Sequence, residues 1–230
     1  MTSTPRIALI HATRVAIQPI EAAFAAHWPQ AQIFSILEEA LSGDLAAGRA
    51  SQAQLDARIL RLADYARDLD PAAILFTCSA FGTGIEAAAR LAPIPVLKPN
   101  EAMFQAAIAL GGRTAMLYTF PPAADGLKQE FHDEAARIGA DARITPIFVP
   151  GALDALKSGD GARHDLLIAE AAAGLAGFDA IMLAHFSMAR AAVEVGGATA
   201  LPVLTSPESA IAKLRGLLGA GAVGKGAASC

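Results

Sequence analysis

One cysteine stands where a buried strand gives way to a helix. Thr77 and Cys78 end an apolar run, and Ser79 and Ala80 follow it before a Phe-Gly-Thr-Gly segment. A helix N-terminus stabilises anions, so we expect the Cys78 thiol to have a lower pKa than an unperturbed cysteine. The backbone N–H groups of Ser79 and Ala80 would hold a carboxylate beside Cys78 and Thr77. The alternative is a small buried apolar side chain, the usual role of a lone cysteine.

A histidine ends a second strand of the same kind. His185 follows the run Asp-Ala-Ile-Met-Leu-Ala and precedes Phe186 and Ser187. Imidazole donates or accepts a proton near neutral pH, which makes His185 a second candidate catalytic residue. Phe186 and Ser187 are then candidate substrate-binding residues. The alternative is an interior histidine that is held by hydrogen bonds.

Further polar side chains stand at the ends of two other strands. His11 and Thr13 follow the first strand, and Tyr118 and Thr119 end a later one. Such groups could orient a substrate carboxylate or hydrogen-bond a developing enolate. Capping of the strand ends is an equally good explanation for each one. The remaining histidines fall in helices or loops, and we expect them at the surface: His27, His132 and His164.

The elements that must position these residues alternate along the chain. Short runs that are apolar at nearly every position predict parallel strands covered on both faces. They span residues 6–12, 31–37, 72–80, 95–99, 114–120, 144–150, 179–187 and 202–207. Longer stretches with helical spacing lie between them, such as 52–69 and 123–140, where Gly139 marks a helix end. This alternation predicts an α/β fold with doubly wound, mostly parallel sheets.

An internal repeat divides the chain into two copies of one small α/β domain. A shift of 107 positions overlays Arg6 on Arg113, Cys78 on His185 and one Pro-Val-Leu segment on another. We therefore predict two pseudo-symmetric lobes, residues 1–100 plus 206–230 and residues 101–205. Ligands of open α/β sheets bind at the carboxyl ends of the strands, so we expect a cleft between the lobes that Cys78 and His185 line from opposite sides.

Composition excludes several functional classes. The chain has 230 residues, 54% of them hydrophobic, and a formal net charge of -4. A near-neutral chain of this kind is a poor nucleic-acid binder, and no apolar run reaches membrane-spanning length. The N-terminus lacks the apolar core of a signal peptide, and the two cysteines, Cys78 and Cys230, form no disulfide framework, so we expect a cytoplasmic protein. Cys230 ends a Gly/Ala-rich tail that we expect to be mobile, with an incidental thiol.

Cofactor motifs are also missing from the sequence. It contains no GxGxxG after the first strand, no phosphate-binding Walker motif and no metal-ligand spacing. We therefore expect an enzyme that uses neither a cofactor nor a metal.

Four segments together carry a resemblance to a known family. These are Ile-Leu-Phe-Thr-Cys78-Ser-Ala, Pro-Val-Leu-Lys-Pro-Asn-Glu-Ala-Met, Gly-Gly-Arg-Thr-Ala-Met-Leu-Tyr-Thr and Asp-Ala-Ile-Met-Leu-Ala-His185. Taken together they resemble the aspartate/glutamate racemase superfamily, which includes hydantoin racemases, maleate isomerases and arylmalonate decarboxylases. The resemblance implies two pseudo-symmetric α/β lobes and cofactor-independent chemistry. It also implies one cysteine per lobe, the two exchanging a proton on opposite faces of the substrate carbon.

This chain departs from that pattern at its second lobe. Cys78 matches the first-lobe cysteine, whereas His185 stands at the second position. Arylmalonate decarboxylases also keep one cysteine, but in the second lobe. The chain therefore matches neither mechanism, and the substrate stays open between a small carboxylate and a cyclic imide.

These observations lead to one expected function and several alternatives. We expect a racemase-type isomerase in which Cys78 transfers a proton at a carbon next to a carboxylate or carbonyl. The alternatives are a decarboxylase in which Cys78 protonates the carbanion, an enzyme in which Cys78 is a nucleophile, and a non-enzymatic carboxylate-binding protein. Two-lobed enzymes of this size often pair, so a homodimer is expected.

Overall fold

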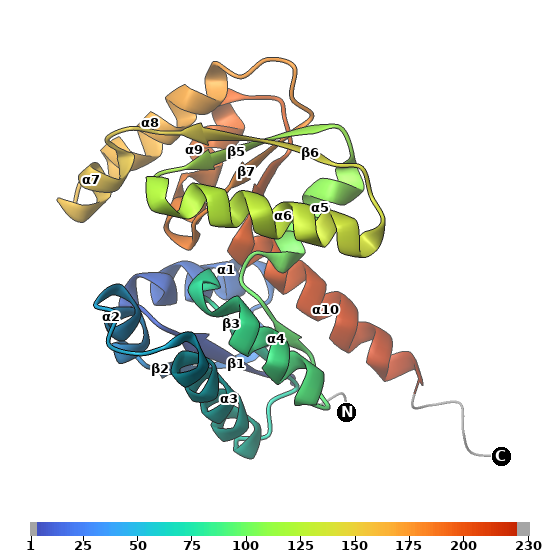
Figure 1. Cartoon of the computed structure of the whole chain (residues 1–230). Helices are drawn as coiled ribbons and strands as arrows, with labels where there is room; N and C mark the ends of the chain where they lie inside the picture. The colour runs from blue at the N-terminus through green and yellow to red at the C-terminus, as the bar shows by residue number, and fades with distance from the viewer. Residues whose placement is uncertain (1–3, 225–230) are drawn as a thin grey trace. The chain divides into compact units, whose positions relative to one another are not determined.

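Strands and helices alternate throughout the structure and build two four-stranded parallel sheets with helices beside them (Figure 1). The computed structural model describes residues 4–224. The chain forms two compact units: the first contains the chain up to Pro99 and again from Ala210, and the second is Asn100–Ser209. The expected α/β fold with parallel sheets is confirmed.

The first unit is built on a sheet with strand order β2-β1-β3-β4. Its strands are β1 (Arg6–His11), β2 (Gln32–Leu37), β3 (Ala73–Phe76) and β4 (Val96–Leu97). Its helices are η1 (Arg14–Ala16), α1 (Ile17–His27), α2 (Ala40–Ala46), α3 (Gln52–Asp68), η2 (Ser79–Phe81) and α4 (Gly82–Leu91), where η denotes a 3-10 helix. The last helix, α10 (Ser206–Gly224), begins in the second unit and continues in the first.

The second unit repeats this plan with strand order β6-β5-β7-β8. Its strands are β5 (Arg113–Tyr118), β6 (Arg143–Phe148), β7 (Ala180–Leu183) and β8 (Val203–Thr205). Its helices are α5 (Glu101–Leu110), η3 (Pro121–Ala123), α6 (Ala124–Ile138), α7 (Ala152–Lys157), α8 (Gly161–Ala173), η4 (Phe186–Ala191) and α9 (Ala192–Ala198).

Each sheet is buried because alternate side chains of its central strands pack against different helices. In the second unit, Ala115 and Leu117 of β5 belong to a core with α8 and α9, while Met116 belongs to a core with α5 and α6. In the first unit, Ala8 and Ile10 of β1 pack in a core with α3 and α4. The strands are therefore apolar at nearly every position, as the sequence indicates.

The register of the sheets confirms the internal repeat. Ile7 pairs with Ala73 in the first sheet, and Thr114 pairs with Ala180 in the second, which is the same pairing shifted by 107 positions. The outer strands β2 and β6 depart from this shift, because Arg6 pairs with Gln32 whereas Arg113 pairs with Arg143. Helix α6 has 15 residues and α1 has 11, which accounts for the four extra positions.

Two expected strands end four residues earlier than the apolar runs suggest, and all the others except 31–37 end one or two residues early. The run 72–80 is a strand only to Phe76, and the run 179–187 only to Leu183, because the chain then turns into η2 and η4. Gly139 ends α6 in the left-handed conformation with φ 71°, as expected for a helix C-terminus. Among residues 4–224, no helix is both long enough and apolar enough to cross a membrane.

Candidate active site

Cys78 lies at the junction between β3 and η2. Its extended backbone (φ -130°, ψ 123°) makes it the N-cap residue of η2, and its side chain is half-buried. The strand is held up to this point, because the N–H of Thr77 donates to the carbonyl of Ile10 at 3.0 Å. The first N–H groups of a helix, here those of Ser79 and Ala80, have no acceptor inside the helix.

His185 occupies the equivalent junction in the second unit. It is the N-cap residue of η4 with an extended backbone (φ -118°, ψ 145°), directly after β7 and Ala184. The N–H of Ala184 donates to the carbonyl of Leu117 at 3.0 Å, which matches the Thr77–Ile10 bond of the first unit under the repeat. The N–H of Met188 closes the turn onto the carbonyl of His185 at 2.9 Å. Cys78 and His185 are therefore structurally equivalent residues.

The imidazole of His185 is poorly solvated. Its Nε2 is buried and has no hydrogen-bond partner among the residues that the structure describes. Burial lowers the pKa of His185 from 6.5 to about 4, because an apolar environment disfavours the imidazolium. At neutral pH, His185 is therefore an uncharged imidazole.

His11 lies in the interior at the end of β1, with both ring nitrogens engaged. Its Nδ1 is 2.9 Å from Oγ1 of Thr77 on one side, and its Nε2 is 3.2 Å from Oγ of Ser35 on the other. Burial lowers the pKa of His11 to about 4. The ring thus ties together β1, β2 and the end of β3, and this geometry favours a positioning role over direct contact with a substrate.

The other candidate residues lie at the same ends of the two sheets and differ in exposure. Thr13 caps η1 without a side-chain hydrogen bond, and Tyr118 packs on Phe148 with ring centroids 5.5 Å apart. Thr119 and Phe186 are buried, Ser187 is half-buried and, in the first unit, Ser79 is half-buried and Ala80 exposed. Of the predicted residues, the structure joins His11 to Thr77 by a side-chain bond.

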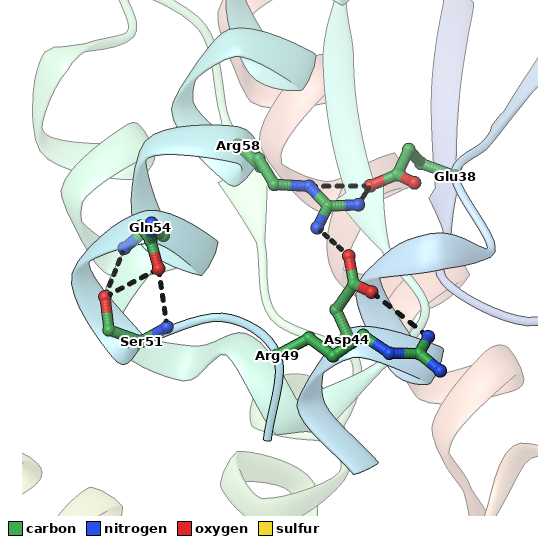
Figure 2. Close-up of polar contacts among 6 residues, drawn as sticks. All are labelled: Glu38, Asp44, Arg49, Ser51, Gln54 and Arg58. Atoms are coloured by element: carbon green, nitrogen blue, oxygen red, sulfur yellow. Dashed lines mark hydrogen bonds and ion pairs between the residues drawn. The ribbon is translucent and has the colours of Figure 1, made fainter. Parts of the chain in front are cut away.

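A charged network that sequence reasoning missed supports the segment after β2 (Figure 2). The N–H of Glu38 donates to the carbonyl of His11 at 3.0 Å, and the Glu38 carboxylate is bound by Arg58 of α3. Arg58 also donates from Nη1 to Asp44 at 2.7 Å. Ser51 and Gln54 form a capping box at the start of the same helix. These charges are far apart in the sequence and carry no local pattern that would have predicted the network.

The expectation that His164 lies at the surface is wrong. Its side chain is fully buried in α8, with Nδ1 2.7 Å from Oδ1 of the buried Asp165. The spacing of His164, Ile168 and Ala172 is the helical spacing of a buried stripe and would have predicted this placement. His27 and His132 are exposed, as expected.

The described residues contain no group of three or more His, Cys, Asp or Glu side chains that could hold a metal ion. The segment after Cys78 contains Gly82 and Gly84, and Gly84 lies against Asp56 and Ile59 of α3. Gly84 therefore serves helix packing between α3 and α4.

Comparisons with known proteins agree with this architecture. The structure is similar to an allantoin racemase from Klebsiella pneumoniae with a TM-score of 0.74 and 20% identity, covering 95% of this chain and 89% of that one. A glutamate racemase from Bacillus anthracis gives a TM-score of 0.70 at 12% identity, with 95% and 83% covered. A Gly-to-Cys mutant of arylmalonate decarboxylase also gives 0.70, at 18% identity, with 94% of both chains covered.

At these identities the three similarities establish the fold alone. No curated protein sequence gives a significant match. The sequence profile of the Asp/Glu/hydantoin racemase family matches residues 8–145, which is more than half of the chain. The chain therefore belongs to the Asp/Glu/hydantoin racemase family.

Proposed function

We propose that this protein is a cofactor-independent isomerase of the racemase type, in which Cys78 transfers a proton at a carbon next to a carboxylate or carbonyl. The substrate is a small carboxylate or a cyclic imide. The observation that carries the proposal is the equivalent placement of Cys78 and His185, each the N-cap residue after the third strand of its unit in a racemase-family fold. Cys78 is partly exposed there, as a group that meets a substrate must be.

The proposed reaction begins with the Cys78 thiolate as a base. The substrate C–H bond breaks, the proton moves to sulfur, and the electron pair is delocalised into the adjacent carbonyl as an enolate. N–H groups of Ser79 and Ala80 and the hydroxyl groups of Thr13 and Tyr118 are proposed to stabilise that charge. Return of a proton to the other face of the carbon, with His185 as the second proposed catalytic group, completes the inversion.

The protonation state of His185 limits its role as the second proton donor. With a pKa of about 4, roughly one His185 in a thousand is protonated at pH 7. A direct donation from imidazolium therefore requires that the bound anionic substrate raises this pKa. A carboxylate close to the ring would do so, because an opposite charge favours the protonated form.

A decarboxylase is the second candidate, and the same histidine favours it. His185, the residue equivalent to Cys78 in the second unit, is a neutral and poorly solvated imidazole. This suits a reaction in which the Cys78 thiol is the single proton donor. The C–C bond to a carboxylate breaks, carbon dioxide leaves, the electron pair stays on the substrate carbon, and the Cys78 thiol protonates it. An apolar environment assists the loss of carbon dioxide, because it destabilises the charged carboxylate more than the delocalised carbanion.

The proposal includes no metal or coenzyme and a cytoplasmic location, on the basis of the missing cofactor motifs and the sparse use of cysteine. Activity is expected to survive dialysis against a chelator. Recovery of activity only after a metal or coenzyme is added would overturn this part of the proposal.

Proton NMR in deuterium oxide tests the main proposal on a panel of small amino acids, hydantoins and malonates. Loss of a substrate C–H signal with inversion indicates the isomerase, and loss of carbon dioxide with deuterium in the product indicates the decarboxylase. Cys78→Ala is the matched inactive variant, and Cys230→Ser is the control that keeps activity. Binding of carboxylates without any exchange or turnover would overturn the proposal in favour of a binding protein.

A further inference from the structure

Two helices that cover the sheets begin in the same way. In α3, Oγ of Ser51 accepts from the N–H of Gln54 at 3.3 Å, and in α8, Oδ1 of Asp160 accepts from the N–H of Arg163 at 2.9 Å. Each acceptor is the N-cap residue of its helix, so the two helices can be aligned from these residues. This alignment places Asp56 of α3 on Asp165 of α8, each five positions after its N-cap.

Asp56 holds the segment that begins at Cys78. Its Oδ1 accepts from Oγ1 of Thr83 at 2.8 Å and from Nε2 of Gln52 at 2.8 Å. Thr83 lies in α4, five positions after Cys78. The neighbouring Gly84 allows this approach, because a Cβ there would lie 3.0 Å from Cα of Asp56.

Asp165 holds the segment that begins at His185. Both of its carboxylate oxygens lie 3.0 Å from Nε of Arg190, and Arg190 lies in η4, five positions after His185. Gly161 allows this approach, because a Cβ there would lie 2.4 Å from Nη2 of Arg190. The carboxylate is buried and also bonds Nδ1 of His164.

His164 supplies a second partner for the buried carboxylate of Asp165. A carboxylate only accepts hydrogen bonds, so Nδ1 of His164 carries the hydrogen that is shared with Oδ1 of Asp165 at 2.7 Å. Asp165 is therefore held from its own helix by His164 and reaches η4 through Arg190.

We propose that Asp56 and Asp165, which occupy equivalent places in α3 and α8 when the two helices are aligned at their N-caps, are positioning residues, each fixing the segment that begins at the candidate catalytic residue of its own unit. This inference rests on the proposed function for the roles of Cys78 and His185. Short 3-10 helices have poor internal hydrogen-bond geometry, so contacts from neighbouring helices help to decide where they lie. Asp165 bonds η4 itself through the guanidinium of Arg190, whereas Asp56 bonds the hydroxyl of Thr83 in α4, the helix that directly follows η2.

Local probes in each unit test the inference without any substrate. In a Cys230→Ser background, the rate constant of iodoacetamide with Cys78 reports on the first unit. The pKa of His185, measured by NMR of its ring protons, reports on the second. Asp56→Ala is expected to change the Cys78 rate about threefold or more and to leave His185 unchanged. Asp165→Ala is expected to raise the His185 pKa from about 4 toward 6.5, because water enters, and to leave Cys78 unchanged.

Matched controls lie on the same helices. Asp64 of α3 and Glu170 of α8 are exposed carboxylates that pair with Arg67 and Arg163, and neither is bonded to Thr83 or Arg190. Asp64→Ala and Glu170→Ala are expected to leave both probes unchanged. If either alanine variant at Asp56 or Asp165 fails to fold, the isosteric Asn variant replaces it, with Arg190→Gln as the partner change.

Turnover supplies the second readout. On the substrate identified by the NMR panel, kcat is expected to fall about tenfold in each aspartate variant with KM nearly unchanged, because misplaced groups slow the chemical step. Lower thermal stability with both local probes unchanged would overturn the inference and leave the aspartates purely structural. Changed probes with full turnover in Cys78→Ala would instead refute the proposed function and leave the local positioning intact.

Discussion

Nδ1 of His11 lies 2.9 Å from Oγ1 of Thr77, the residue that immediately precedes Cys78. Thr77 is held again through its hydroxyl and its N–H, which both contact the carbonyl of Ile10, at 3.4 and 3.0 Å. The backbone that enters the candidate catalytic turn is therefore fixed by a buried histidine from the neighbouring strand. A change at His11 should reach Cys78 through Thr77.

His11→Phe removes these bonds and keeps the ring volume. The free energy of unfolding is expected to fall by about 1–3 kcal/mol, because one buried and one part-buried hydrogen bond are lost. Urea denaturation measures this loss. Ser35→Ala removes only the half-exposed bond and should cost less. Equal losses in the two variants would contradict the assignment of Thr77 as the main partner of His11.

Stability is expected to fall as the pH drops from 7 toward 4. The pKa values of His11 and His185 are about 4 in the folded protein, whereas an unperturbed histidine has a pKa of 6.5, so between these values the unfolded chain binds more protons. Each histidine thus contributes up to about 3 kcal/mol above pH 6.5, and this contribution is lost as the pH falls toward 4. Urea denaturation at several pH values measures the effect.

The double variant His11→Asn with His185→Asn is the control for the pH effect. It removes both groups and should have a flatter dependence of the unfolding free energy on pH between 6.5 and 4. An unchanged slope would assign the effect to other groups.

Cys78 is expected to react with iodoacetamide faster than glutathione does at neutral pH, in a Cys230→Ser background. The reason is its place at the start of a helix with a partly exposed side chain. Mass spectrometry follows the labelling. A small dicarboxylate should slow it by occupying the same turn, and chloride at equal ionic strength is the control. Labelling as slow as that of a buried thiol would indicate that Cys78 serves only as a small apolar side chain in the packing of the protein.

His185→Asn separates the two candidate reactions. A two-face proton transfer should lose at least about 100-fold in kcat, because the second proton donor is absent. A decarboxylation in which Cys78 alone protonates the product should change less than about tenfold. Steady-state kinetics on the identified substrate decides between them.

Gly112 and Gly111 form a matched pair at the start of β5. Both have positive φ, 74° and 71°, but only at Gly112 would a Cβ meet a neighbour, Oδ2 of Asp179 at 2.1 Å. That oxygen accepts from the N–H of Arg113 at 2.7 Å. Gly111→Ala should cost about 1 kcal/mol of unfolding free energy, and Gly112→Ala about 1–3 kcal/mol more. Thermal unfolding compares them, and equal costs would contradict the close approach of Asp179.

The sequence determined the fold class and the repeat, because both are local properties. Buried parallel strands are apolar at nearly every position, and a shift of 107 residues shared by three strands of each unit can be found without knowledge of packing. It also placed Cys78 and His185 at strand ends, where side chains are within reach of a ligand. The predicted ends of the strands were less accurate. The apolar runs continue past Phe76 and Leu183 into turns that also bury apolar residues.

Only the tertiary structure decided what the polar residues touch. His11 bonds Thr77, 66 positions away, and Asp165 bonds Arg190, 25 positions away. Such contacts depend on the distance between elements after packing, and no local pattern records that distance. The low pKa of His185 likewise comes from burial by the folded chain. Desolvation is a property of the surroundings, whereas the sequence supplies only the imidazole.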